Sequence, residues 1–186
     1  GKVICSELSY VLFTSGTTGI PKGVKISKDN LDGFLSHYLN PKLYDFSVKD
    51  RFLQSYELTF DVSVFCFALP LMLGGTLVLL PNSGIKYMSI LQTLAKEKIT
   101  VTSNVPSTLK FSFNRLQELT FPNLRYSFFS GEALFGNWAK KWMDCAPNAQ
   151  VYNCYGPTET TIVCTAELLN NLEEVYFDSP LPLPLG

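Results

Sequence analysis

The feature that most constrains the fold is the alternation of short strand-like runs with longer helical patterns along the 186 residues. Runs rich in β-branched and aromatic residues, at 8–13, Arg51–Gln54 and 76–80, are typical of strands. Segments such as 89–98 instead space apolar residues three or four apart, as an amphipathic helix does. This alternation predicts an α/β fold, a layered, largely parallel sheet with flanking helices.

The same patterns assign the other elements. Further strands are expected at 23–26, 100–103, 124–129, 150–154 and 160–165. Further helices are expected at 27–37, 60–73, 107–119 and 133–146. Ser27 is expected to cap the first of these helices, and Gly74 with Gly75 to end the second. The proline-spaced tail is expected to be an extended connector.

Composition excludes several classes of partner. Hydrophobic residues make up 46% of the chain and charged residues only 17%, against a usual value of about 25%, which indicates a buried core. The net charge is −1 and there is no basic run, so no nucleic-acid partner is expected. The apolar stretch 58–80 is long enough for a membrane span. It contains Asp61, Pro70 and two glycines, which favour a buried helix, a turn and a strand, with no membrane contact.

The five cysteines point to a reducing compartment. Their number is odd, they are widely spaced and none forms a CxxC pair, so neither a disulfide framework nor a zinc site is indicated. The sequence starts at Gly1 and shows no signal peptide. We therefore expect a cytoplasmic protein with reduced, mostly buried thiols.

The stretch "YVLFTSGTTGIPKGV" has the composition of a phosphate-binding loop. Its glycines allow backbone N–H groups to approach an oxyanion, hydroxyl side chains add donors, and Lys22 adds charge. Pro21 stands where a Walker A loop would need glycine, so that motif is excluded. The alternative is an ordinary glycine-rich connection.

Three other segments carry chemistry. In "NCYGPTETT", a turn presents Thr158 and Glu159, a hydroxyl and a carboxylate that suit Mg²⁺ shared with a phosphate. In "TFDVSVF", Asp61 stands in an apolar run, where a charge is costly unless it meets a partner such as an ammonium group. The alternatives are a plain turn and a solvent-facing carboxylate at a helix N-terminus. In "SGEAL", the glycine permits close approach of a ligand, and Glu132 is expected to cap the following helix.

The positions of these segments predict one common site. Segments 14–23, 130–133 and 155–159 each follow an expected strand. Ligands of parallel sheets bind beyond the carboxyl ends of the strands, where we expect these segments to meet. His37 is the only histidine, so a serine–histidine triad is not expected.

Taken together, the motifs resemble the adenylate-forming superfamily, which includes acyl-CoA synthetases, luciferases and peptide-synthetase adenylation domains. "YVLFTSGTTGIPKGV", "FDVS" with "LMLGGTL", and "NCYGPTETT" are similar to its signatures, in the same order. The pair Phe60-Asp61 resembles the amino-acid-activating members. "ISKDNL", "SGEAL" and "LPLG" are similar to both D-alanine–carrier-protein ligases and peptide-synthetase domains, and these two remain open.

The resemblance implies ATP and Mg²⁺ as cofactors and gives each motif residue a role. The β- and γ-phosphates would be bound by Thr14, Ser15, Gly16, Thr17, Thr18, Gly19 and Lys22. Thr158 would meet the α-phosphate, and Glu159 would ligate the metal. The adenine would be framed by Gly131, Glu132, Ala133, Asn153 and Tyr155. Asp61 would hold the amine of a small or medium uncharged amino acid. Its side chain would face Val62, Phe65, Ser103, Phe128, Ser130, Cys154, Ile162 and Val163.

The resemblance also implies that residues 1–186 are the central portion of an adenylation domain. Upstream segments and the family's C-terminal lysine-bearing domain are absent from the sequence. The implied reaction converts ATP and an amino acid to aminoacyl-AMP and pyrophosphate, and a carrier-protein thiol then takes the aminoacyl group. The alternatives are an acyl- or aryl-CoA ligase and a non-catalytic nucleotide-binding fragment.

Overall fold

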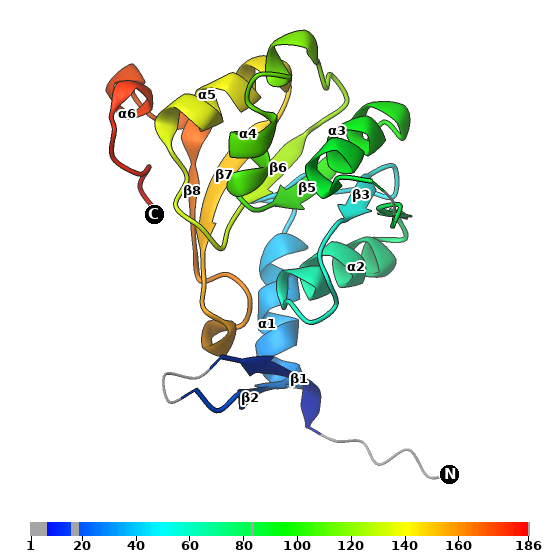
Figure 1. The fold of residues 1–186 in the computed structure, drawn as a ribbon. Coiled ribbons are helices and arrows are strands. Elements are labelled where there is room, and N and C mark those ends of the chain that lie inside the picture. The colour runs from blue at the N-terminus through cyan, green and yellow to red at the C-terminus, as the bar shows by residue number, and fades with distance from the viewer. Residues whose placement is uncertain (1–6, 16–18, 83, 186) are drawn as a thin grey trace.

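A six-stranded sheet forms the centre of the molecule, with strand order β4-β3-β5-β6-β7-β8 (Figure 1). The structure is a computed structural model that describes residues 7–15, 19–82 and 84–185. The strands are β3 (Arg51–Gln54), β4 (Thr76–Leu79), β5 (Val101–Asn104), β6 (Tyr126–Phe129), β7 (Gln150–Tyr155) and β8 (Thr165–Leu168). Neighbouring strands from β4 to β7 pair in parallel, and β8 pairs antiparallel with β7. The predicted α/β fold with a largely parallel sheet is confirmed.

Helices cover both faces of this sheet (Figure 1). One face packs against α1 (Lys28–Tyr38) and α2 (Val62–Leu73), and the other against α3 (Lys86–Lys96), α4 (Ser107–Ser112) and α5 (Gly136–Cys145). Successive strand residues serve opposite faces, as the pleat requires. On β6, Phe128 belongs to the core beneath α1 and α2, and Phe129 to the core beneath α5. The two faces therefore have separate hydrophobic cores.

The phosphate-loop segment lies outside this sheet. β1 (Leu8–Thr14) and β2 (Lys22–Ser27) form their own two-stranded antiparallel sheet, with Thr14 opposite Lys22 (Figure 1). The expectation that the first strand belongs to the parallel sheet is wrong. A parallel partner would need a crossover of a dozen or more residues, whereas the seven residues between β1 and β2 suffice for a hairpin.

Local signals fix several element ends as expected. Ser27 caps α1 in a capping box with Asn30, whose N–H donates to the serine Oγ over 3.1 Å. Gly74 ends α2 in the left-handed conformation, with φ at 70°. The stretch 58–80 forms a helix, a turn and a strand. Within the described residues, no helix is both long and apolar enough to cross a membrane.

Other boundaries differ from the prediction. The strand expected at 160–165 is wrong, because a 3₁₀ helix at Thr158–Thr160 and a tight turn come first and β8 begins at Thr165. The helix expected at 107–119 divides into α4 and a 3₁₀ helix at Leu116–Glu118, and the helix expected from residue 133 begins at Gly136. A short helix that the sequence did not predict, α6 (Glu174–Asp178), packs against α5 before the extended tail.

A buried ion pair closes the edge of the sheet where the parallel strands begin. The carboxylate of Asp50 accepts two hydrogen bonds from Arg125 Nη1, each 2.8 Å long. It also accepts from Thr100 Oγ1 at 2.7 Å and from the Ser47 N–H at 2.8 Å. These four bonds join the loops that lead into β3, β5 and β6.

Candidate active site

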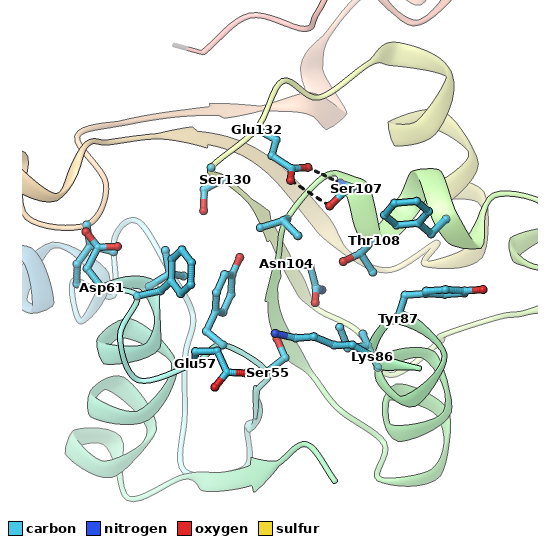
Figure 2. Close-up of a pocket in the computed structure, with 18 of the residues that line it drawn as sticks. Ser55, Glu57, Asp61, Lys86, Tyr87, Asn104, Ser107, Thr108, Ser130 and Glu132 are labelled. Atoms are coloured by element: carbon cyan, nitrogen blue, oxygen red, sulfur yellow. Dashed lines mark hydrogen bonds between the residues drawn. The ribbon is translucent and has the colours of Figure 1, made fainter. Parts of the chain in front are cut away.

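A cleft of about 560 Å³ opens at the carboxyl ends of the parallel strands (Figure 2). Its walls include Ser55 after β3, Asn104 at the end of β5, Ser130 after β6 and Gly156 after β7. Asp61 lies at one end of the cleft, and α3 borders the other with Lys86 and Tyr87 (Figure 2). Two of the three predicted segments, 130–133 and 155–159, therefore meet at the predicted edge of the sheet.

Asp61 is a buried carboxylate in front of the first turn of α2. It is 8% exposed, which excludes the alternative of a solvent-facing helix carboxylate. Its Oδ2 atom accepts no hydrogen bond from any residue that the structure describes. Burial raises the pKa of Asp61, and the negative charge of Glu159 raises it further. Hydrogen bonds from the Thr158 hydroxyl and from the backbone N–H groups of Val62 and Asp61 act in the opposite direction and lower it. Asp61 is thus a costly charge open to a cationic partner.

A strained turn places the end of the "YGPTETT" motif. Ile162 is buried and has φ at 73°, a conformation that β-branched residues rarely adopt and that costs about 1–3 kcal/mol. A Cβ atom on Gly156 would lie 2.5 Å from the Ile162 carbonyl oxygen, so only glycine fits where the two backbone segments cross. This crossing directs Ile162 into the interior, where it lines the cleft and a second cavity.

The second cavity is small and lies between the sheet and helices α1 and α2. All eight residues predicted to face the substrate side chain line it, together with Tyr38 of α1: Tyr38, Val62, Phe65, Ser103, Phe128, Ser130, Cys154, Ile162 and Val163. Its volume, for the centre of a water-sized sphere, is about 10 Å³, which is room for roughly one water molecule. Burial raises the pKa of the Cys154 thiol to about 12, so at neutral pH Cys154 is a small neutral wall residue.

The residues predicted to frame adenine lie along the ends of β6 and β7. Gly131 has φ at 88°, and Tyr155 is 51% exposed at the end of β7. Asn153 is buried, and its Nδ2 donates to the carbonyl of Pro184 over 2.7 Å. Its Oδ1 finds no hydrogen-bond donor among the described residues. Gly131, Ala133 and Tyr155 are exposed whereas Asn153 is not, and the role of all four toward adenine stays a prediction.

Glu132 has a different structural role from the expected one. Its carboxylate accepts hydrogen bonds from the Ser107 N–H at 2.8 Å and from Ser107 Oγ at 3.1 Å (Figure 2). It therefore caps α4, and the expectation that it caps the following helix is wrong. A capping residue lies directly before the first turn of its helix, and α5 starts only at Gly136, too far along the chain from Glu132. The first residue of α4, Ser107, instead lies within hydrogen-bond distance of Glu132.

The predicted phosphate-binding residues surround the β1–β2 hairpin loop. Thr14, Ser15, Gly19 and Lys22 are exposed or half-buried there, and Gly16, Thr17 and Thr18 lie outside the described residues. β2 contacts the 3₁₀ helix Thr158–Thr160, and the hairpin lies beside that turn in Figure 1. The fold thus brings the described part of the predicted phosphate loop next to Thr158 and Glu159.

The donor set fits a magnesium ion held mainly by phosphates. No group of three or more histidine, cysteine or acidic residues suited to a metal occurs in the described ranges. Glu159 is an exposed carboxylate on the turn beside the hairpin and interacts electrostatically with Asp61. Mg²⁺ commonly binds one or two carboxylates and completes its shell with phosphate oxygens and water, so Glu159 suits that role.

Several polar groups of the site escaped the sequence analysis. The Oδ1 of Asn104 is buried in the cleft wall without a hydrogen-bond partner in the described ranges. The Tyr56 hydroxyl is also buried in the cleft wall, where it interacts with the hydroxyls of Ser103 and Ser130. The Tyr10 hydroxyl lies outside the cleft wall and is buried without a partner among the described residues, and its pKa is raised to about 12 by burial and by the charge of Asp61. Asn104 follows a strand and the strand-end rule could have found it, whereas Tyr10 and Tyr38 carry no local signal.

D-alanine–D-alanyl carrier protein ligases are among the known proteins that the chain resembles. The chain is 33% identical over 179 residues to a D-alanine–D-alanyl carrier protein ligase of Streptococcus pyogenes, which covers 94% of this chain and 35% of that protein. The chain thus spans about a third of the length of the curated relatives it matches.

Solved structures with the same fold include an adenylation domain and a peptide synthetase. AlmE, an adenylation domain of Vibrio cholerae solved with glycyl-adenosine-5'-phosphate, superposes with a TM-score of 0.79 at 35% identity, over 88% of this chain and 31% of that one. AB3403, a four-domain nonribosomal peptide synthetase bound to AMP and glycine, gives a TM-score of 0.72 at 27% identity, over 88% and 12%. The sequence profile of the AMP-binding enzymes matches residues 5–182. The chain therefore belongs to the AMP-binding enzyme family.

Proposed function

We propose that the protein containing this chain activates a small amino acid, converting ATP and the amino acid to aminoacyl-AMP and pyrophosphate. The observation that carries the proposal is the environment of Asp61. Its buried Oδ2, without a hydrogen-bond donor in the described ranges, lies where the cleft and the small cavity adjoin, because neighbouring Val62 lines both. An α-ammonium group would supply the missing partner.

Charge complementarity favours an amino acid over a simple carboxylic acid. A hydrogen bond between an ammonium group and a carboxylate contributes about 1.5–3 kcal/mol. The substrate of an acyl- or aryl-CoA ligase has no amine and would leave the buried charge of Asp61 without a counterion. Asp61 therefore weighs against that alternative.

The small cavity favours glycine or alanine. Room for about one water molecule accommodates a hydrogen atom or a methyl group and excludes a longer side chain unless the wall moves. The relatives support this size, since one is a D-alanine ligase and two solved structures hold glycine or its adenylate.

The reaction requires positioning and charge neutralisation. A carboxylate oxygen of the amino acid attacks the α-phosphorus of ATP, a new P–O bond forms, and the bond to the leaving pyrophosphate breaks. We assign Thr158 to the α-phosphate, and Lys22 with the hairpin loop to the β- and γ-phosphates. Glu159 would hold Mg²⁺, which neutralises phosphate charge when bound. Asp61 and the cavity fix the amine and side chain, which orients the carboxylate.

The aminoacyl group would then pass to a carrier-protein thiol in the cytoplasm. The D-alanyl carrier protein ligases support the partner. The four cysteines that the structure describes, Cys66, Cys145, Cys154 and Cys164, are free thiols, which suits a reducing compartment. Burial raises the pKa of Cys66 and Cys154 to about 12 and keeps both protonated, so neither is suited to act as the attacking thiol.

Amino-acid-dependent ATP–pyrophosphate exchange tests the proposal. The full-length protein is assayed with glycine, both alanine enantiomers, leucine, phenylalanine, a fatty acid and benzoate. We expect exchange with glycine or an alanine, and strong loss of it in Asp61→Asn. Exchange with only the fatty or aromatic acid would instead favour a CoA ligase. Absence of exchange with every acid would favour a non-catalytic nucleotide-binding protein.

A further inference from the structure

We propose that Tyr38 sets the upper size limit of the amino-acid side chain. Its ring separates the small cavity from a larger groove beside the C-terminal end of helix α1, and this separation keeps the cavity small. The inference rests on the proposed function, in which the small cavity holds the substrate side chain. It adds a specificity-determining residue that lies outside the three motifs.

The groove behind the cavity is large. Its volume is about 380 Å³, against about 10 Å³ for the cavity, and its walls include Phe34 and His37 of α1, Tyr44, and Tyr152 of β7. Tyr38 and Val163 line both spaces. A residue that lines both spaces belongs to the partition between them, so Tyr38 and Val163 are the places where the partition is a single side chain thick. Phe128 and Tyr152, by contrast, stack across it as a pair with centroids 5.2 Å apart.

The Tyr38 ring is held between two sets of aromatic side chains. On the cavity side its centroid lies 4.8 Å from that of Phe65 and 5.8 Å from that of Phe128. On the groove side it lies 5.0 Å from Tyr44 and 5.3 Å from His37. These spacings are those of directly packed rings, so the partition is one ring thick at this position. Tyr38 is only 3% exposed, which shows that its neighbours fill the space around it.

The origin of the partition explains why the motifs do not reveal it. Tyr38 is the last residue of α1, a helix that starts at the Ser27 cap directly after the β1–β2 hairpin. The other cavity walls come from α2, from β5 to β7, and from the turn that carries Ile162. Residue 38 thus reaches the cavity only through the packing of α1 on the sheet.

Removing the ring would join the two spaces. A side chain that extends through the gap would enter a groove whose walls include the rings of Phe34, Tyr44 and Tyr152 and several aliphatic side chains. The substrates gained are therefore expected to be apolar or aromatic amino acids, such as leucine and phenylalanine. Charged amino acids are not expected to gain, because the groove walls carry no carboxylate or ammonium group.

The test compares variants of the full-length protein in ATP–pyrophosphate exchange with glycine, alanine, leucine and phenylalanine. For Tyr38→Ala we expect the ratio of leucine or phenylalanine exchange to alanine exchange to rise at least about tenfold. Tyr38→Phe keeps the ring and should keep the preference of the unsubstituted protein. His37→Ala removes a groove residue that does not line the cavity and should also leave the preference unchanged.

A second variant is needed because deleting a buried ring destabilises a core and Tyr38→Ala can fail to fold. Val163 is only half-buried, so Val163→Ala thins the same partition at a smaller cost. We expect it to shift the preference in the same direction by a smaller factor. Circular dichroism and thermal melting show which variants are folded, and Val163→Ala decides the question if Tyr38→Ala does not fold.

The outcomes separate the two proposals. If the unsubstituted protein exchanges with glycine or alanine, and the folded variants keep that preference without gaining larger substrates, the role of Tyr38 is wrong and the proposed function stands. If the unsubstituted protein exchanges with no amino acid, the proposed function is wrong and the role of Tyr38 fails with it. A gain of larger substrates in the folded variants supports both.

Discussion

Two buried aspartates at opposite edges of one sheet have opposite surroundings. Asp50, where the parallel strands begin, is 1% exposed and accepts hydrogen bonds from Arg125, Thr100 and Ser47. Asp61, where the strands end, is 8% exposed, and its Oδ2 has no donor among the described residues. Asp50 thus has a cationic partner, whereas the carboxylate of Asp61 has only the Thr158 hydroxyl and backbone N–H groups and no counter-charge among the described residues. Since a buried charge without a counter-charge is costly, the protein retains that cost at one edge and removes it at the other.

The neighbours of Asp61 extend the contrast. The buried Oδ1 of Asn104 also lacks a partner in the described ranges, and Asn104 lines the cleft. Away from the cleft, the indole N–H of Trp142 donates to Ser127 Oγ over 3.0 Å. The beginning of the sheet is thus organised for stability and its end for a ligand, and each prediction below tests that division.

The largest effect is expected from Asp50. Replacing it with alanine would leave Arg125 Nη1, Thr100 Oγ1 and the Ser47 N–H without this acceptor, and leaving buried donors unsatisfied costs up to about 3 kcal/mol. Urea unfolding of Asp50→Ala measures the loss. Asp45 also pairs with Arg125 but is 89% exposed, so Asp45→Ala should cost less than about 0.5 kcal/mol. Equal costs for the two variants would contradict the division.

The second effect is expected in function. Asp61→Asn keeps the shape of the side chain and removes the charge that would hold the substrate amine. We expect kcat/KM for the amino acid in pyrophosphate exchange to fall about 10- to 100-fold. Stability should stay unchanged or rise slightly, because a costly charge has gone. If Asp61→Asn lowers the free energy of unfolding but leaves kcat/KM unchanged, Asp61 has a structural role like that of Asp50.

Sequence reasoning succeeded where local pattern and strand order decide the structure. The strands β3, β5, β6 and β7 and the cap at Ser27 follow from periodicity and capping chemistry, and parallel pairing places the ends of β6 and β7 together. The eight cavity residues came from the family resemblance, because neither spacing nor composition shows which side chains surround one small space.

It failed where distant segments decide. The residues Ile162 and Val163 favour a strand locally, but the crossing of the backbone over Gly156 imposes a positive φ at Ile162. Glu132 caps a helix 25 residues earlier in the chain, which the sequence around it cannot indicate. Both errors lie beside the site, where tertiary contacts override local preference.

Glu132 is a useful contrast to Asp61, because both carboxylates line the cleft but Glu132 accepts two hydrogen bonds from Ser107. Its two bonds to Ser107 predict a structural contribution of about 1 kcal/mol. Unfolding of Glu132→Ala, Ser107→Ala and the double variant in a mutant cycle measures the coupling between the two residues. Glu132→Gln keeps an acceptor oxygen and should lose less. Because Ser107→Ala keeps the backbone N–H that donates to Glu132, the cycle measures only the Oγ bond, and unchanged stability in Glu132→Ala is the result that would remove the capping role.

The smallest effect is the pH dependence of Asp61, and its sign is opposite to that of most carboxylates. Burial raises the pKa of Asp61 above the ordinary 3.8, so in the window between 3.8 and the raised value the folded protein holds more protons than the unfolded chain. The free energy of unfolding that depends on this group therefore falls as pH rises through that window. An ordinary paired aspartate would make it rise.

The amino acid should respond in the other direction. Its ammonium group binds ionised Asp61, so substrate affinity should increase as pH rises through the same window, while this contribution to stability decreases. The measurement is the difference in unfolding free energy between the unsubstituted protein and Asp61→Asn, from about pH 4 to 7, since other titrating groups cancel in that difference. Opposite slopes for stability and affinity would show that the unpaired carboxylate is kept at the expense of the fold and for the benefit of the ligand. A difference that rises with pH would mean that Asp61 is already paired, and one that does not change would mean that its pKa is not raised; either result would remove the contrast between the two edges.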